Sequence, residues 1–123
     1  MRIILADHHV KPRWALKALL EEQPEFDLLG EAVDSQGLLA LAETHTADLV
    51  LIDSELPDLY LEDLIARLHA LEPRPVVIVM SSEFSNSRKV LKAGADAFVS
   101  KADQPDWLLE TLQKFESRIK KDG

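Results

Sequence analysis

Residues 48–52 read DLVLI, an almost unbroken apolar run that ends directly before the acidic residue Asp53. Such a run is typical of a strand that is buried between helices on both faces of a parallel sheet. Two further runs share this character, namely RIILA at Arg2–Ala6 and VVIVM at residues 76–80. The sequence therefore predicts three central strands.

Two other runs extend the pattern outward. Residues 26–32 (FDLLGEA) mix polar and apolar side chains and are expected at one edge of the sheet, and residues 96–100 (DAFVS) are expected at the other edge. A segment with apolar residues at helical spacing follows each run. Regular alternation of strands and helices indicates βαβ units, and hence an α/β fold with helices on both faces of a parallel sheet.

Start and stop signals place the helices. Pro12 suits a first helical turn, Asp34 is a suitable N-cap, and Gly94 is typical of the residue that follows a helix. The first four helices are expected near residues 12–20, 34–44, 60–71 and 88–93. The last helix is expected to start near Asp103 or Gln104 and to keep its inner apolar face as far as residue 119.

Composition bounds the class of protein. The chain has 123 residues, of which 46% are apolar and 29% are charged, and this suits one globular domain. We assign residues 1–119 to that domain and residues 120–123 to a tail or the start of a linker. Cysteine is absent, which excludes disulfides and thiolate chemistry. The net charge of −8 argues against direct nucleic-acid binding.

The N-terminus and the apolar runs bear on location. An acid at position 7 comes too early for a secretory signal peptide, and no apolar run approaches the length of a membrane span. We expect a soluble cytoplasmic protein that does not insert into membranes.

Polar residues follow four of the expected strands. Ligands of open parallel sheets bind beyond the carboxyl ends of the strands, where these side chains would meet. The residues are Asp7, His8 and His9 after the first strand, Asp53 after the third, Ser81 and Ser82 after the fourth, and Lys101 after the fifth.

These residue types suit phosphoryl chemistry. A carboxylate such as Asp53 can attack a phosphoryl group, Lys101 can neutralise the incoming charge, and Ser81 can donate a hydrogen bond. Mg²⁺ prefers oxygen ligands, which Asp7, Asp53 and the backbone carbonyl near Glu55 would supply. No glycine-rich phosphate loop is present, so a nucleotide is not the expected ligand.

Five segments together resemble the receiver domains of two-component response regulators. They are ADHH at residues 6–9, LIDSELP at 51–57, VMSS at 79–82, AGADAF at 93–98, and Lys101. The first two strand–helix units are most similar to receivers of NarL/LuxR-type transcription regulators. The resemblance implies a flavodoxin-like, CheY-like fold with five strands in the order 2-1-3-4-5.

The resemblance also implies roles. A sensor histidine kinase would transfer a phosphoryl group to Asp53, Asp7 would help to hold Mg²⁺, and Lys101 would contact the phosphoryl group. Ser81 would be the switch hydroxyl and Phe98 the switch aromatic residue. The chain would act in signalling rather than as a metabolic enzyme, with a C-terminal DNA-binding domain outside this chain.

Three features depart from the family pattern. His8 stands where the family usually has a second acid, and imidazole is a poor ligand for Mg²⁺, so weakened Mg²⁺ binding is expected. The segment from Ser81 to Lys101 is short, with the shortening expected in the fourth helix or at residues 83–87. The glycines that are common after Pro57 are missing. The alternative is a pseudo-receiver, the same fold used as an interaction module without phosphorylation.

Two pairs of residues leave further alternatives open. His8 and His9, together with Asp53, offer the alternative interpretation of a zinc site. We disfavour it because adjacent histidines are expected to point in different directions. Trp14 and Trp107 fall outside the apolar faces of the first and last helices. Two exposed tryptophans on one side of the fold would suggest a homodimer surface.

Overall fold

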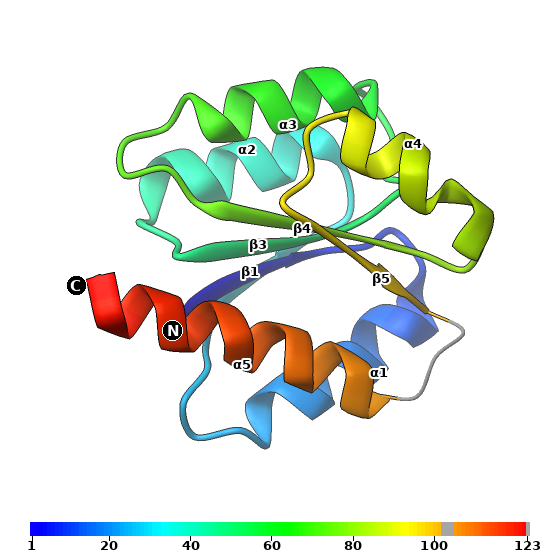
Figure 1. Cartoon of the computed structure of the whole chain (residues 1–123). Helices are drawn as coiled ribbons and strands as arrows, with labels where there is room; N and C mark the ends of the chain where they lie inside the picture. The colour runs from blue at the N-terminus through cyan, green and yellow to red at the C-terminus, as the bar shows by residue number, and fades with distance from the viewer. Residues whose placement is uncertain (102–104, 123) are drawn as a thin grey trace.

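The computed structural model describes residues 1–101 and 105–122 and contains one sheet of parallel strands covered by helices (Figure 1). The strand order is β2-β1-β3-β4-β5, so the predicted order and both predicted edge strands are confirmed. The strands are β1 (Arg2–Ala6), β2 (Asp27–Ala32), β3 (Leu49–Asp53), β4 (Val76–Ser81) and β5 (Ala97–Ser100).

The helices form a layer on each face of the sheet. Figure 1 shows α2, α3 and α4 on one face and α1 and α5 on the other. The helices are α1 (Val10–Glu21), α2 (Ser35–Thr44), α3 (Leu61–His69), α4 (Ser87–Lys92) and α5 (Pro105–Asp122). The start expected near Asp103 or Gln104 lies outside the described residues. None of the helices in the described part is long and apolar enough to cross a membrane.

Each central strand contributes to two separate cores, because alternate residues of a strand point to opposite faces. On β3, Val50 and Ile52 pack in the core beneath α2, α3 and α4, whereas Leu49 and Leu51 pack in the core beneath α1 and α5. All four side chains are fully buried. Burial on both faces explains why DLVLI has no polar alternation.

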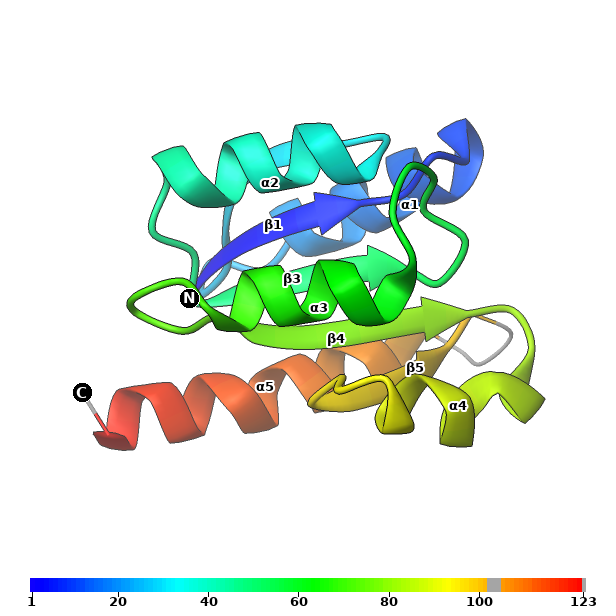
Figure 2. The same ribbon diagram turned by 90° about the horizontal axis from the view of Figure 1, so that it is seen from above.

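The parallel register brings the carboxyl ends of the strands to one edge of the molecule. Ala6 of β1 pairs with Ile52 of β3, and Asp53 pairs with Met80 of β4. Seen from above, the arrowheads of the central strands point the same way (Figure 2). The polar residues that end or follow the strands are thereby gathered at this edge.

The β4–β5 connection is compact. A 3-10 turn at Phe84–Asn86 leads into α4, which has only six residues. Gly94 follows with φ of 114°, a left-handed conformation that side chains disfavour, as its predicted place after the helix requires. A Cβ atom on Gly94 would lie 3.2 Å from Cγ2 of Ile65 in α3.

Replacing Gly94 with Ala should therefore destabilise the domain by about 1–2 kcal/mol, the cost of a left-handed backbone for an L-residue. Gly94→Asn should cost less, because asparagine tolerates this conformation better. Urea unfolding of the three proteins measures the difference. Equal stability of the Ala variant and the parent would contradict the strain.

Candidate functional site

An ammonium group lies between two carboxylates at the carboxyl edge of the sheet. Nζ of Lys101 donates a hydrogen bond of 2.6 Å to Oδ2 of Asp7 and lies 2.9 Å from Oδ1 of Asp53. These residues come from the ends of β5, β1 and β3. The structure thus brings together three of the residues that the sequence predicted to meet.

Burial makes this arrangement electrostatically demanding. Asp7 is fully buried and Asp53 is 2% exposed, so each carboxylate needs a partner to offset lost hydration. Burial alone would raise the pKa of Asp7, but hydrogen bonds from Lys101 and His9 outweigh it and hold the pKa below its ordinary value. Burial would likewise lower the pKa of Lys101, yet its bonds to both carboxylates raise that pKa. Asp7 and Lys101 are therefore both charged at neutral pH.

Backbone amides orient the other oxygen of each carboxylate. The N–H of His9 donates to Oδ1 of Asp7 at 2.9 Å, and the N–H of Glu55 donates to Oδ2 of Asp53 at 3.3 Å. Each carboxylate therefore turns one oxygen toward Lys101 and the other toward the loops that carry His8, His9 and Glu55. These two outer oxygens are the ones that remain for a ligand.

Both histidines after β1 face this cluster, so the expectation that they point in different directions is wrong. Their ring centroids lie 3.9 Å apart, and Nδ1 of His8 and Nδ1 of His9 lie 3.8 and 3.5 Å from Oδ2 of Asp53. The reason is the turn before α1, where His9 is the N-cap residue and its backbone N–H is tied to Asp7.

The side chains of His9 and Glu55 join the site. His9 was among the residues expected at this edge, whereas only the backbone carbonyl of Glu55 was predicted to take part. Nδ1 of His9 lies 2.9 Å from Oδ1 of Asp7, and its Nε2 lies 3.5 Å from Oε2 of Glu55. Adjacency to Asp7 was the available signal for His9. The Glu55 contact depends on the path of the loop after β3, which the sequence does not specify.

Ser81 connects the site to the entry of α4. Its buried hydroxyl accepts hydrogen bonds of 3.1 Å from the backbone N–H of Glu83 and from Nδ2 of Asn86. Phe98 is half-buried and packs against the core beneath α2, α3 and α4. The switch roles of Ser81 and Phe98 stay predictions. Asn86 was not singled out in the sequence, and no motif marks it.

Hydrogen bonds from the first residue of α2 fix the loop after Asp53. The backbone N–H and the hydroxyl of Ser35 both donate to the carbonyl of Pro57, at 3.1 and 2.7 Å. Asp58 then has φ of 92°, the backbone conformation that glycine adopts most easily. A left-handed Asp58 in place of a glycine is thus how the chain makes this turn.

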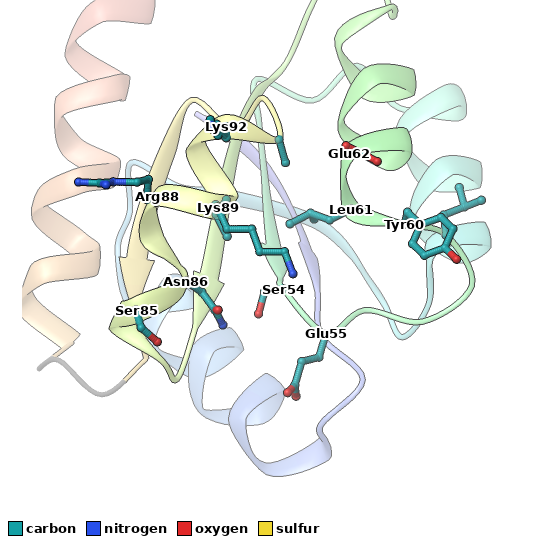
Figure 3. A pocket seen from close by; sticks show the side chains of 13 residues that line it. Ser54, Glu55, Tyr60, Leu61, Glu62, Ser85, Asn86, Arg88, Lys89 and Lys92 are labelled. Carbon is teal, nitrogen blue, oxygen red and sulfur yellow. The ribbon is translucent and has the colours of Figure 1, made fainter.

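A hollow of about 1080 Å³ lies between the loop that follows Asp53, the start of α3, and α4 (Figure 3). Ser54 and Glu55 line one side, and Lys89 extends into it from α4. The hollow gives a ligand access to the residues that directly follow Asp53. Its basic wall on α4 favours anionic groups.

The outer oxygens of Asp7 and Asp53 suit a divalent cation, but the set is incomplete for Mg²⁺. Mg²⁺ takes oxygen ligands, and the two imidazole nitrogens stand where further oxygens would serve it. Asp7, His8, His9 and Asp53 each offer one ligand atom within 4.8 Å of the others. The site therefore offers Mg²⁺ two carboxylates, with none from position 8.

Trp14 of α1 and Trp107 of α5 are 64% and 61% exposed. Both helices cover the same face of the sheet (Figure 1). The predicted exposure of the two tryptophans is confirmed, and the helices that carry them lie on the face of the sheet opposite α2, α3 and α4 (Figure 1).

The fold and this edge cluster define a class. Residues 3–113 match the family model described as the response regulator receiver domain, and the chain belongs to that family. The nitrate/nitrite response regulator protein NarL of Escherichia coli (strain K12) is 31% identical over 91% of this chain and 53% of its own length. The transcriptional regulatory protein DegU of Brevibacillus brevis is 27% identical over 92% and 49%. The chain thus spans about half the length of these relatives.

Solved structures agree with the fold. RcsB from Salmonella enterica serovar Typhimurium, bound to promoter rprA in the presence of phosphomimetic BeF3-, superimposes with a TM-score of 0.84. It shares 22% identity and covers 95% of this chain and 60% of its own. A LuxR family DNA-binding response regulator from Silicibacter pomeroyi has a TM-score of 0.77, 28% identity, and 94% and 90% coverage. The CheY-like receiver fold and the NarL/LuxR resemblance are confirmed.

Replacing Lys101 with Met should lower the free energy of unfolding at neutral pH by about 3 kcal/mol, because two buried carboxylates lose their cation. The loss should shrink as the pH falls. In the parent, the lowered pKa of Asp7 gives stability that is present above the ordinary value of 3.8 and lost below it. In the variant, burial raises that pKa, so protonation on acidification relieves the penalty.

Urea unfolding of both proteins between about pH 4 and pH 7 measures this difference. Lys17→Met is the matched control. Nζ of Lys17 lies 3.2 Å from Oε2 of Glu31, and the Lys17 side chain is 44% exposed. That surface pair should contribute less than about 1 kcal/mol. If Lys101→Met lost as little free energy of unfolding as Lys17→Met, the contact of Lys101 with the two carboxylates would not stabilise the site.

Proposed function

We propose that this receiver takes a phosphoryl group on Asp53 from a phosphohistidine of a sensor histidine kinase, as a signalling step rather than a metabolic reaction. The observation that carries the proposal is the buried carboxylate of Asp53 beside an ammonium group that also binds Asp7. A structural salt bridge needs only one carboxylate. A second buried acid, at the open edge of the sheet, is costly unless the site has a ligand to bind.

The residues divide the chemistry between them. A carboxylate oxygen of Asp53 attacks the phosphorus atom, the phosphorus–nitrogen bond breaks, and the donor histidine leaves as an imidazole that takes up a proton. Lys101 offsets the negative charge that arrives, because it already lies 2.9 Å from Asp53. The Ser81 hydroxyl then donates to a phosphoryl oxygen. The hydroxyl now accepts hydrogen bonds from Glu83 and Asn86, so a change in the position of Ser81 would be passed to the start of α4.

Mg²⁺ would be held by the outer oxygens of Asp7 and Asp53, with the carbonyl of Glu55 as a further ligand. When bound, it neutralises charge on the phosphoryl oxygens. We expect its affinity to be low because position 8 supplies an imidazole rather than a carboxylate.

The direct test is the intact mass of the chain after incubation with a small phosphodonor and Mg²⁺. We expect a single phosphoryl adduct that Asp53→Asn abolishes. Asp58→Asn is the matched control, because it makes the same change at an exposed acid of the following loop and leaves Asp53 in place. No adduct under conditions that label another receiver would overturn the proposal and favour the pseudo-receiver, a fold that acts only by binding partners.

Restoring an acid at position 8 should reveal the cost of His8. In His8→Asp, the Mg²⁺ concentration that gives half-maximal labelling should fall by about tenfold, since a carboxylate ligand is added. Labelling is followed by the same mass measurement across a Mg²⁺ titration. An unchanged Mg²⁺ requirement would mean that position 8 does not contribute to the metal site.

We also propose that the receiver works with a DNA-binding domain in the whole protein. The relatives that match are named as response and transcription regulators and are about twice as long. With a net charge of −8, this receiver is unsuited to DNA contacts, so we assign them to another domain.

The face of α1 and α5 is our candidate for a homodimer surface, since Trp14 and Trp107 are large, exposed and carried by helices on the same face of the sheet (Figure 1). Light scattering should show self-association that rises with concentration and weakens in the double variant Trp14→Gln, Trp107→Gln. Tyr60→Gln, at an 80% exposed aromatic residue at the N-cap of α3, should leave association unchanged. A monomer at high concentration would exclude the dimer.

A further inference from the structure

Two imidazoles converge on the outer carboxylate oxygens of the site. Asp7, His8, His9 and Asp53 offer four ligand atoms, all within 4.8 Å of one another. The carboxylates are buried, whereas the His8 and His9 side chains are 38% and 40% exposed. The cluster is therefore fixed at its base and open to solvent at the histidines, so an ion can enter.

The spacing of the atoms suits a tetrahedral ion. Metal–nitrogen and metal–oxygen bonds of about 2.0–2.1 Å place the ligands of a tetrahedral Zn²⁺ about 3.3 Å apart. The measured separations are 2.9 Å between Nδ1 of His9 and Oδ1 of Asp7, 3.5 Å between Nδ1 of His9 and Oδ2 of Asp53, and 3.8 Å between Nδ1 of His8 and Oδ2 of Asp53. These three values lie on both sides of the ideal edge, and every separation in the cluster is within 4.8 Å, so movements of the side chains alone complete the geometry.

The surrounding groups orient the ligands as they do around bound metals. Lys101 binds the inner oxygens of both carboxylates and leaves the outer ones for an ion. Glu55 lies 3.5 Å from Nε2 of His9, so its carboxylate is placed to accept a hydrogen bond from that nitrogen when Nδ1 binds an ion. A carboxylate on the far nitrogen of a metal-bound histidine is a common supporting contact.

Charge and ligand type favour a transition metal over Mg²⁺. Lys101 offsets one of the two carboxylate charges, so the cluster attracts a purely electrostatic ligand such as Mg²⁺ only weakly. Two imidazole nitrogens suit Zn²⁺, Co²⁺, Ni²⁺ and Cu²⁺, which all bind nitrogen well.

From this geometry we infer that Asp7, His8, His9 and Asp53 form a binding site for a divalent transition-metal ion of the Zn²⁺ type. The site uses the carboxylates of the proposed phosphoacceptor site, but the binding does not require that Asp53 is phosphorylated. An ion held there occupies the outer oxygen of Asp53, and it competes with Mg²⁺ for the same two acids.

The test measures ion binding directly and uses no phosphodonor. Calorimetry with Zn²⁺ should show one ion per chain, retained in excess Mg²⁺, and Co²⁺ should give the intense visible absorption of a tetrahedral site. His8→Gln and His9→Gln should each lower the Zn²⁺ affinity by about tenfold or more, because each removes one ligand nitrogen. Circular dichroism verifies that each variant is folded.

His45→Gln is the matched control, because His45 is exposed at the end of α2 and does not belong to the cluster. It should bind Zn²⁺ as the parent does. The inference is overturned if the parent binds no Zn²⁺, if Co²⁺ keeps its pale octahedral spectrum, or if His45→Gln loses as much affinity as His8→Gln. Any of these results leaves phosphorylation of Asp53 untouched, since that is read by mass.

Discussion

The contact of the Lys101 ammonium group with Asp7 and Asp53 is the interaction on which the site depends. It joins the ends of β1, β3 and β5, and in the case of Asp7 it spans 94 residues of sequence. Two buried carboxylates side by side would repel each other and protonate without a cation between them. With Lys101 in place, Asp7 and Lys101 stay charged, and the buried carboxylate of Asp53 has a cationic partner at the carboxyl edge of the sheet.

The fold positions that contact, and most of the fold could be predicted from the sequence. Unbroken apolar runs such as DLVLI identify strands buried on both faces, and a parallel sheet then brings Asp7, Asp53 and Lys101 to one edge. Gly94 has the left-handed backbone that its place after a helix predicts. These features were predictable because each rests on local patterning or on the topology of parallel sheets.

Other features of the site depend on loop geometry and could not be derived in the same way. The two histidines converge because the turn before α1 ties the His9 backbone to Asp7, a contact that periodicity does not reveal. Ser35 holds the carbonyl of Pro57 across 22 residues, and Asn86 binds Ser81 from the short connection before α4. Such hydrogen bonds are decided by where the loops lie after the core has packed.

The account is tested most directly by following Lys101 itself as a phosphoryl mimic binds. Nitrogen-15 NMR of the lysine side chains, with beryllofluoride added in the presence of Mg²⁺, reports the environment of Nζ. We predict that the Lys101 signal moves together with the amides of Ser54 and Glu55, and that Asp53→Asn removes all of these changes. A Lys101 signal that stays fixed, or that moves equally in the Asn variant, would contradict the claim that this contact assembles a phosphoacceptor site.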